Sequence, residues 1–95
     1  MNVKVKTKVT KDADKLPKSA KETAENIIED LKAAATLSNI PDVRKLEGTD
    51  EPYYRIKFGN YRMMLYYEHA TETVKVLSIT HRQESYKKHN LPWRK

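Results

Sequence analysis

Hydrophobic and polar residues alternate strictly near the start of the chain. Residues 3–9, which read VKVKTKV, place a β-branched side chain at every second position and a lysine between each pair. This period-2 pattern is typical of a half-buried strand, so we predict a strand over residues 3–9. Lysines along its outer side would also protect an edge strand from pairing with another chain.

Two helices are predicted after this strand. Residues 10–16 can form a short helix that Pro17 would end, and a longer helical pattern covers residues 19–36. Its apolar positions follow the helical period and form one stripe. They are Ala20, Ala24, Ile27, Ile28, Leu31, Ala34 and Ala35. Ser19 and Glu22 have the spacing of a capping box, which predicts the start of this helix.

The second half of the chain reads mainly as strands. Residues 38–52 contain two prolines and a glycine and are predicted to form a loop. Strands are predicted over residues 53–58, 61–68 and 73–79, and the first two flank Gly59-Asn60, a two-residue hairpin signal. A short helix over residues 81–88 would follow, with a second capping box formed by Thr80 and Gln83.

This order of elements, β-α-α-β-β-β-α, predicts an α+β fold. We expect an antiparallel sheet of about four strands, with the helices over residues 10–16 and 19–36 packed on one face. A length of 95 residues leaves room for a single domain spanning residues 1–95.

The two-residue turn fixes which hairpin residues oppose each other. Phe58 then pairs with Tyr61 and Lys57 with Arg62, and directly opposed residues share one face of a sheet. One face is therefore a predicted core, made of Tyr54, Ile56, Phe58, Tyr61, Met63, Leu65 and Tyr67. The other face holds Tyr53, Arg55, Lys57, Arg62, Met64 and Tyr66.

Three cations gather on the second face, with no acid near the turn. Arg55 and Lys57 are separated by about 6.6 Å along their strand. Two unit charges at that distance repel by about 2.5 kcal/mol at an effective dielectric of about 20, before salt and side-chain flexibility reduce the effect. A bound polyanion would offset this repulsion. Long side chains that reach into water are the alternative, and the pattern alone leaves both interpretations open.

Composition narrows the function classes further. The chain has no cysteine, which excludes disulfides and thiolate metal sites. It also has no apolar run long enough for a membrane span, so we expect a cytoplasmic protein.

The charges are distributed unevenly along the chain. Residues 1–52 carry ten basic and ten acidic residues, whereas residues 53–95 carry nine basic and three acidic ones. The net charge of +6 therefore arises in the second half. This asymmetry indicates a surface that faces a polyanion, although a solvated basic face would give the same count.

Residues of the last predicted helix extend the cationic group. Arg82 and Tyr86 are four positions apart and would share one helix face. An arginine beside an aromatic ring suits a phosphate and a stacked base. His81 could act as an acid or base or could bond locally at the helix start. Glu47 could be a general base or a solvated loop acid.

Taken together, these segments resemble the RelE/ParE superfamily of toxins from type II toxin–antitoxin systems. The similarity is carried by KLEG (45–48), YYRIKFGNYRMMLYY (53–67) and VKVLSITHRQESYKK (74–88), so it spans nearly the whole chain. It implies the RelE-like microbial RNase-type fold. It also implies the activity of RelE-like mRNA interferases, which are ribosome-dependent endoribonucleases.

The resemblance also implies a set of functional residues. Carried over residue by residue, the catalytic group is Arg55, Lys57, Arg62, Arg82 and Tyr86, and RNA contacts are expected from Tyr53, His81, Lys87 and Lys88. Two departures from the family pattern stand out. Arg55 occupies a position where lysine is usual, and an arginine cannot serve as a base. The spacing from Arg82 to Tyr86 is also shorter than usual.

The implied reaction is attack by the 2′-OH of the RNA on the adjacent phosphate. It leaves a 2′,3′-cyclic phosphate and a 5′-OH, and it requires no metal or cofactor. Lys57 is then the candidate base, and Arg55 and Arg62 would stabilise the negative charge that develops on the phosphorane. Arg82 would act near the leaving oxygen, and Tyr86 would stack on or orient a base.

A toxin of this superfamily implies partners. We expect a cognate acidic antitoxin with a partly disordered arm, mRNA on the ribosome, and operator DNA contacted only through the toxin–antitoxin complex. Two other functions stay open at this point. One is a ParE-type inhibitor of DNA gyrase on the same fold, and the other is a degenerate, non-catalytic relative that only binds antitoxin or nucleic acid. Trp93 is a candidate contact for a partner.

Overall fold

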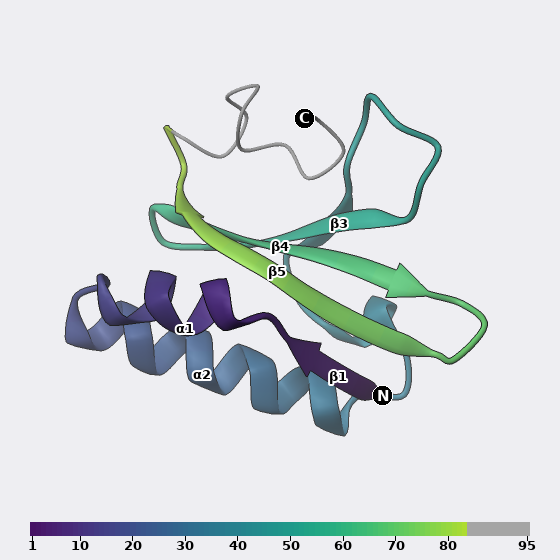
Figure 1. Cartoon of the computed structure of the whole chain (residues 1–95), viewed down its shortest axis with the longest axis horizontal. Helices are drawn as coiled ribbons and strands as arrows, with labels where there is room; N and C mark the ends of the chain where they lie inside the picture. Colours follow the sequence, from purple (N-terminus) through teal and green to yellow (C-terminus); the bar gives the residue numbers. More distant parts are fainter. Residues whose placement is uncertain (84–95) are drawn as a thin grey trace.

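The computed structural model describes residues 1–83, and these form two helices and a five-stranded sheet. The strands are β1 (Asn2–Val5), β2 (Val43–Lys45), β3 (Tyr53–Phe58), β4 (Tyr61–Glu68) and β5 (Thr73–His81). The helices are α1 (Thr7–Asp14) and α2 (Lys18–Ala33), with a short 3₁₀ turn over Leu37–Asn39. Figure 1 shows both helices on the same side of the sheet. The predicted α+β class with two helices on one face is confirmed.

The sheet is mixed, in the order β1-β5-β4-β3-β2. Three of its four pairings are antiparallel, as predicted, but β1 pairs parallel with β5, from Asn2 opposite Thr73 to Val5 opposite Val76. The fifth strand, β2, lies within the segment that was predicted to be a loop. It is three residues long and pairs with β3, so its order comes from this neighbour rather than from a periodic pattern of its own.

The first strand ends earlier than its alternating pattern predicts. β1 stops at Val5, the N–H of Lys6 still donates to the Val76 carbonyl (3.1 Å), and α1 begins at Thr7. The prediction of a strand through residue 9 is therefore wrong. Val9 is buried, but from the helix, and it packs into the core together with Ala13 and Leu16. Ala13 lies four positions after Val9, and Leu16 lies three positions after Ala13, which is the spacing of one helix face.

The second helix spans Lys18–Ala33 and presents the predicted stripe to the core. Ala24 and Leu31 are buried, and Ile27, Ile28 and Ala34 pack against the core. The predicted capping box is wrong, because Pro17 is the N-cap and no side chain caps the helix. Ser19 already lies inside the first turn, where its carbonyl accepts a hydrogen bond from Thr23 Oγ1 (2.9 Å).

The hairpin register is as predicted from the turn. Phe58 opposes Tyr61, Lys57 opposes Arg62 and Ile56 opposes Met63. Gly59 has φ +56°, and Asn60 is not among the residues with positive φ, which matches a type II′ turn with glycine at its first central position. A Cβ at Gly59 would meet no atom within 4 Å, so the requirement for glycine here is conformational rather than steric.

One hydrophobic core fills the space between the helices and the sheet. Ile56, Phe58, Met63, Leu65, Val74, Val76 and Ile79 contribute the sheet side, and Val9, Ala24, Leu31 and Ile40 cover it. Tyr54, Tyr61 and Tyr67 are partly buried against this core, which confirms the predicted core face of the hairpin. In the part of the chain that the structure describes, no helix is long and apolar enough to cross a membrane.

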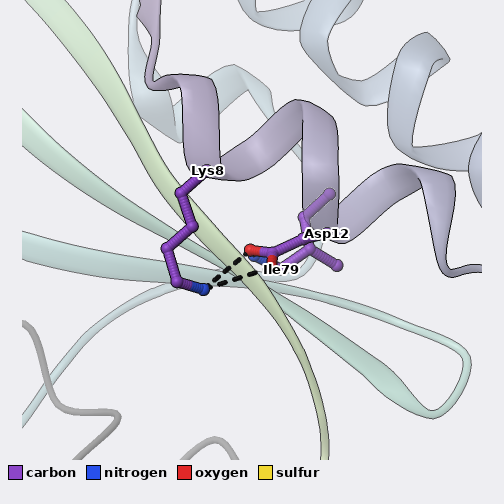
Figure 2. A network of polar contacts seen from close by, with 3 residues as sticks. All are labelled: Lys8, Asp12 and Ile79. Carbon is purple, nitrogen blue, oxygen red and sulfur yellow. Dashed lines mark hydrogen bonds and ion pairs between the residues drawn. The ribbon is translucent and has the colours of Figure 1, made fainter.

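A partly buried carboxylate joins α1 to the sheet. Because β1 ends at Val5, no strand among residues 1–83 lies beside the edge of β5 beyond Val76. The Asp12 side chain is only 15% exposed. Its carboxylate accepts a hydrogen bond from the backbone N–H of Ile79 (3.0 Å) and forms an ion pair with Lys8 Nζ (3.0 Å). Figure 2 shows the Asp12 carboxylate between Lys8 and Ile79. The carboxylate thus satisfies an edge N–H that a neighbouring strand would otherwise bind.

The chain departs from prediction again at the end of β5. His81 is still in the strand and residues 82–83 form a turn, so a helix starting at His81, with Thr80 as its cap, is wrong. The remainder of the predicted helix, residues 84–88, lies outside the described residues.

Candidate nucleic-acid interface

The sheet face turned away from α1 and α2, here named the distal face, carries most of the predicted functional residues. Side chains alternate between the two faces of a strand, and opposed residues share a face. With the observed register, this face holds Lys4 of β1, Arg44 of β2, Tyr53, Arg55 and Lys57 of β3, Arg62, Met64 and Tyr66 of β4, and Lys75 of β5.

Three predicted catalytic residues come together at the hairpin end of this face. Lys57 and Arg62 are directly opposed, and Arg55 lies two positions before Lys57 on β3. Opposed Cβ atoms in an antiparallel pair are about 4.5–5.5 Å apart. The prediction that Lys57 and Arg62 share one face is therefore confirmed. Met64, which opposes Arg55, is fully buried.

Arg62 holds a donor that is not satisfied within the described part of the chain. Its Nη1 donates to the carbonyl of Tyr61 (3.0 Å), which fixes the guanidinium against its own strand. Its Nε is buried, yet no acceptor lies within hydrogen-bonding distance among residues 1–83. A buried N–H without an acceptor is costly, and a guanidinium offers a planar set of donors that matches phosphate oxygens.

Arg82 lies beside the hairpin turn. Its backbone N–H donates to the Asn60 carbonyl (2.6 Å), which ties the end of β5 to the turn next to Lys57 and Arg62. Its side chain is exposed. This contact brings the backbone of the fourth predicted catalytic residue to the turn between Lys57 and Arg62, although Arg82 is distant from both in the sequence.

His81, in contrast, pairs with Tyr61 and lies on the helix-covered side. Its ring is edge-on to that of Tyr61, with centroids 5.6 Å apart. Its Nδ1 accepts a hydrogen bond from the backbone N–H of Gln83 (3.2 Å). This is the local bonding considered as the alternative to an acid–base role. Tyr86, Lys87 and Lys88 lie outside the described residues, as does Trp93.

Tyr53 is partly buried at the other end of β3, next to Tyr66. The two rings meet edge to face, with centroids 5.0 Å apart. Burial, and after it the neighbouring Tyr66 and Glu51, raises the pKa of Tyr53 above its usual value. Tyr53 is therefore a neutral phenol at physiological pH, which suits a stacking or hydrogen-bonding role and not that of a base.

The structure adds cations that the sequence interpretation had not included. Arg44, assigned to a loop, opposes Arg55 across β2 and β3. Lys4 opposes Lys75 across β1 and β5. The alternation of lysine and valine near the start of the chain signalled Lys4 as an outward residue, but nothing in the sequence indicated which strand would lie beside it.

The chemistry available here is that of phosphate binding and charge stabilisation. Among residues 1–83, no group of three or more histidine, aspartate or glutamate side chains could hold a metal ion. Glu47, the other candidate base, is exposed in the loop after β2. The cationic end of the distal face is suited to an RNA or DNA backbone.

Sequence comparison identifies the family. A sequence model of the ParE toxin of the type II toxin–antitoxin system parDE matches residues 3–86, which is most of the chain. The chain belongs to this toxin family. It is a RelE/ParE-type toxin of a type II toxin–antitoxin system, as the resemblance of its motifs implied.

Individual relatives agree with the family. The RelE1 protein of Methanocaldococcus jannaschii, itself named as a candidate toxin, is 29% identical over 86 residues, covering 90% of this chain and 94% of the relative. The RelB–RelE complex from Methanococcus jannaschii matches with a TM-score of 0.74 and 25% identity, over 87% of this chain and 94% of the other. The RelE–RelB complex of Pyrococcus horikoshii OT3 matches with a TM-score of 0.71 and 28% identity, over 85% and 93%. These solved structures are complexes of a RelE toxin with a RelB antitoxin.

Proposed function

We propose that this toxin is a ribosome-dependent endoribonuclease that cuts mRNA by attack of the RNA's own 2′-OH. The observation that carries the proposal is the group of cations at the hairpin end of the distal face. Arg55, Lys57 and Arg62 share that face, and the backbone of Arg82 is bonded to the turn beside them. The relatives named RelE support this activity over other toxin activities.

Each residue has a place in the reaction. The 2′-oxygen attacks the adjacent phosphorus while its proton passes to Lys57, the candidate base. Arg62, with a buried N–H that has no acceptor among the described residues, and Arg55 stabilise the charge of the phosphorane. Arg82 stabilises the negative charge on the 5′-oxygen as the phosphorus–oxygen bond breaks, and that oxygen then takes a proton from water. The products are a 2′,3′-cyclic phosphate and a 5′-OH.

Cleavage would depend on the ribosome because these cations do not by themselves orient the RNA for attack. A group of charges binds any phosphate, but it does not hold the 2′-oxygen in line with the leaving oxygen. The ribosome would impose that geometry on the mRNA. This target would place the protein in the cytoplasm.

The proposal is tested by primer extension on mRNA translated in a cell-free system. Wild-type protein should introduce cuts only when the mRNA is translated. Lys57→Ala, Arg62→Ala and Arg82→Ala should each reduce the cleavage rate by about a hundredfold to a thousandfold, with a much smaller loss of binding, because their charges matter most as the phosphorane forms. Lys32→Ala, which removes a lysine from the helix side, is the matched control and should cut like the wild type.

Equal cleavage by the wild type and Arg82→Ala would contradict the assignment of Arg82. Equal cleavage by all three variants would contradict the proposed site. Three further variants lie beyond residue 83. Tyr86→Ala should lower the cleavage rate through loss of base stacking or orientation. Lys87→Ala and Lys88→Ala should mainly weaken the binding of RNA and reduce its dependence on salt.

We also propose a cognate acidic antitoxin that covers the cationic face and, in complex with the toxin, binds operator DNA. The solved relatives in complex with RelB support a partner of this kind. Co-expression with the adjacent reading frame should give a complex that survives moderate salt. Recovery of the toxin alone under those conditions would argue against the pairing.

The second candidate function is inhibition of DNA gyrase. It is favoured by one observation, namely that the matching family model is that of the ParE toxin. A supercoiling assay with purified gyrase separates the two activities. Inhibition of supercoiling without cleavage of translated mRNA would establish the second function in place of the first.

A further inference from the structure

A second group of aromatic and cationic side chains occupies the distal face away from the hairpin turn. Tyr66 lies four residues beyond Arg62 on β4, and Tyr53 lies four residues before Lys57 on β3. At about 3.3 Å per residue, Tyr66 is about 13 Å from Arg62 and Tyr53 about 13 Å from Lys57, with Arg55 about halfway along β3, all on the same face of the two strands. This distance is too long for contact with the phosphate that is cut, but it is short enough for a nearby nucleotide of the same strand.

The contacts of Tyr66 differ from those of the core tyrosines. Tyr54, Tyr61 and Tyr67 pack against the hydrophobic core, whereas Tyr53 and Tyr66 are not part of it. Tyr66 instead meets Tyr53 edge to face, and Lys75 Nζ lies 5.8 Å from the centroid of its ring. Core packing therefore accounts for three of these tyrosines but gives no reason for the aromatic pair on the distal face.

The charges around this pair repeat the arrangement seen at the hairpin turn. Lys75 forms an ion pair with Glu68 (3.0 Å), yet it also faces Lys4 directly across β1 and β5. Like charges in directly opposed positions destabilise a sheet. Glu68 is paired with Lys75, and no ion pair between Lys4 and an acid is found among the described residues. A bound phosphate would offset the remaining charge.

We propose that Tyr66, with Tyr53, forms a stacking platform for a base of single-stranded RNA near the cut, and that Lys75 and Lys4 bind the phosphate beside that base. The inference rests on the proposed function for the identity of the bound strand. A ring beside cations is the usual means by which proteins hold an unpaired nucleotide without reading its sequence. The platform continues the line of cations from the turn, which favours one bound strand along the sheet over a separate partner.

The test uses the full-length protein and a short single-stranded RNA that cannot be cut because all its 2′-OH groups are methylated. One position carries 2-aminopurine, whose fluorescence falls when it stacks on an aromatic ring. Affinity is measured separately by fluorescence anisotropy with an end-labelled copy of the RNA. Both readouts are independent of cleavage, so they report on the platform even if the enzyme activity is absent.

Wild-type protein should quench the 2-aminopurine signal at saturation for at least one placement of the label. Tyr66→Leu, which keeps an apolar side chain on β4, should abolish that quenching and weaken affinity by about thirtyfold, the middle of the range for one lost base–aromatic stack. Tyr66→Phe, which keeps the ring, should retain the quenching. Lys75→Gln should lower the slope of log affinity against log salt by about 0.7. Lys32→Gln, which removes a lysine with a comparable ion pair on α2, should leave the slope unchanged.

Each result decides the inference separately from the proposed function. If Tyr66→Leu is folded by circular dichroism and quenches like the wild type, the platform does not exist, whether or not the protein cuts mRNA. The same conclusion follows if wild-type protein binds this RNA without quenching any label, or does not bind it. Loss of quenching in Tyr66→Leu together with an inactive wild type would establish an RNA-binding platform and reject the cleavage proposal.

Discussion

The two sides of the sheet differ in how their charged side chains are paired. On the helix side, three lysines have acidic partners: Lys8 with Asp12 (3.0 Å), Lys21 with Asp14 (2.9 Å) and Lys32 with Glu29 (3.2 Å). On the distal face, three pairs of cations are directly opposed across neighbouring strands. They are Arg44 with Arg55, Lys57 with Arg62, and Lys4 with Lys75. Among the described residues of this face, Glu68 forms an ion pair with one of these cations.

This difference separates what the fold requires from what the function requires. Apolar burial and complementary charges on the helix side lower the free energy of the folded chain. Opposed cations raise it, and they are tolerated because single surface interactions contribute only tenths of a kcal/mol each. A toxin that binds a polyanion can carry such a face, and under the proposed function the bound RNA or the antitoxin would supply the missing negative charge.

The largest expected effect is on the helix side. Leu31 is fully buried between α2 and the sheet. Leu31→Ala should lower the free energy of unfolding by about 2–5 kcal/mol, because it removes apolar contacts and leaves a cavity. Urea denaturation followed by circular dichroism measures this. Lys32→Ala, at the next position but exposed, is the control and should change stability by less than about 0.5 kcal/mol. Equal stability of both variants would contradict the assigned core.

An intermediate effect is expected where α1 joins β5. Asp12→Ala should lower the free energy of unfolding by about 1–3 kcal/mol, because the Ile79 N–H loses its acceptor. Asp12→Asn keeps an acceptor oxygen and loses mainly the exposed ion pair with Lys8, so it should cost less. Thermal unfolding of the three proteins gives the order. If the asparagine and alanine variants lose the same stability, the ion pair rather than the edge hydrogen bond is the important contact.

The smallest effect should have the opposite sign on the distal face. Lys57→Gln removes one member of an opposed cationic pair and should raise stability by about 0.5 kcal/mol or less at low salt. The gain should shrink at about 1 M salt, where the Debye length is about 3 Å. Lys21→Gln is the matched change on the helix side. There the hydrogen bond and charge of Asp14 raise the pKa of Lys21, which means that its charged form is favoured in the folded state. Lys21→Gln should therefore be slightly destabilising, and a gain of stability for both variants would remove the contrast between the faces.

Much of the candidate site could be predicted from the sequence because it depends on local geometry. A two-residue turn at Gly59-Asn60 fixes the hairpin register, and the register determines that Lys57 and Arg62 share a face. The same reasoning separates Met63, which lies in the core, from Met64, which opposes Arg55 on the distal face. The helical period likewise predicts which side of α2 is buried. These relations need only the spacing of residues along one or two adjacent elements.

Other features were decided by contacts between distant parts of the chain. The end of β1 at Val5 depends on β5, whose Val76 carbonyl binds Lys6 just before α1 begins. β2 is too short to show a period and exists because β3 lies beside it, which in turn brings Arg44 opposite Arg55. The sequence by itself therefore determined the hairpin, its two faces and the family resemblance. Only the tertiary structure decided which cations from separate segments become neighbours, because strand pairing depends on backbone hydrogen bonds that carry little sequence signal.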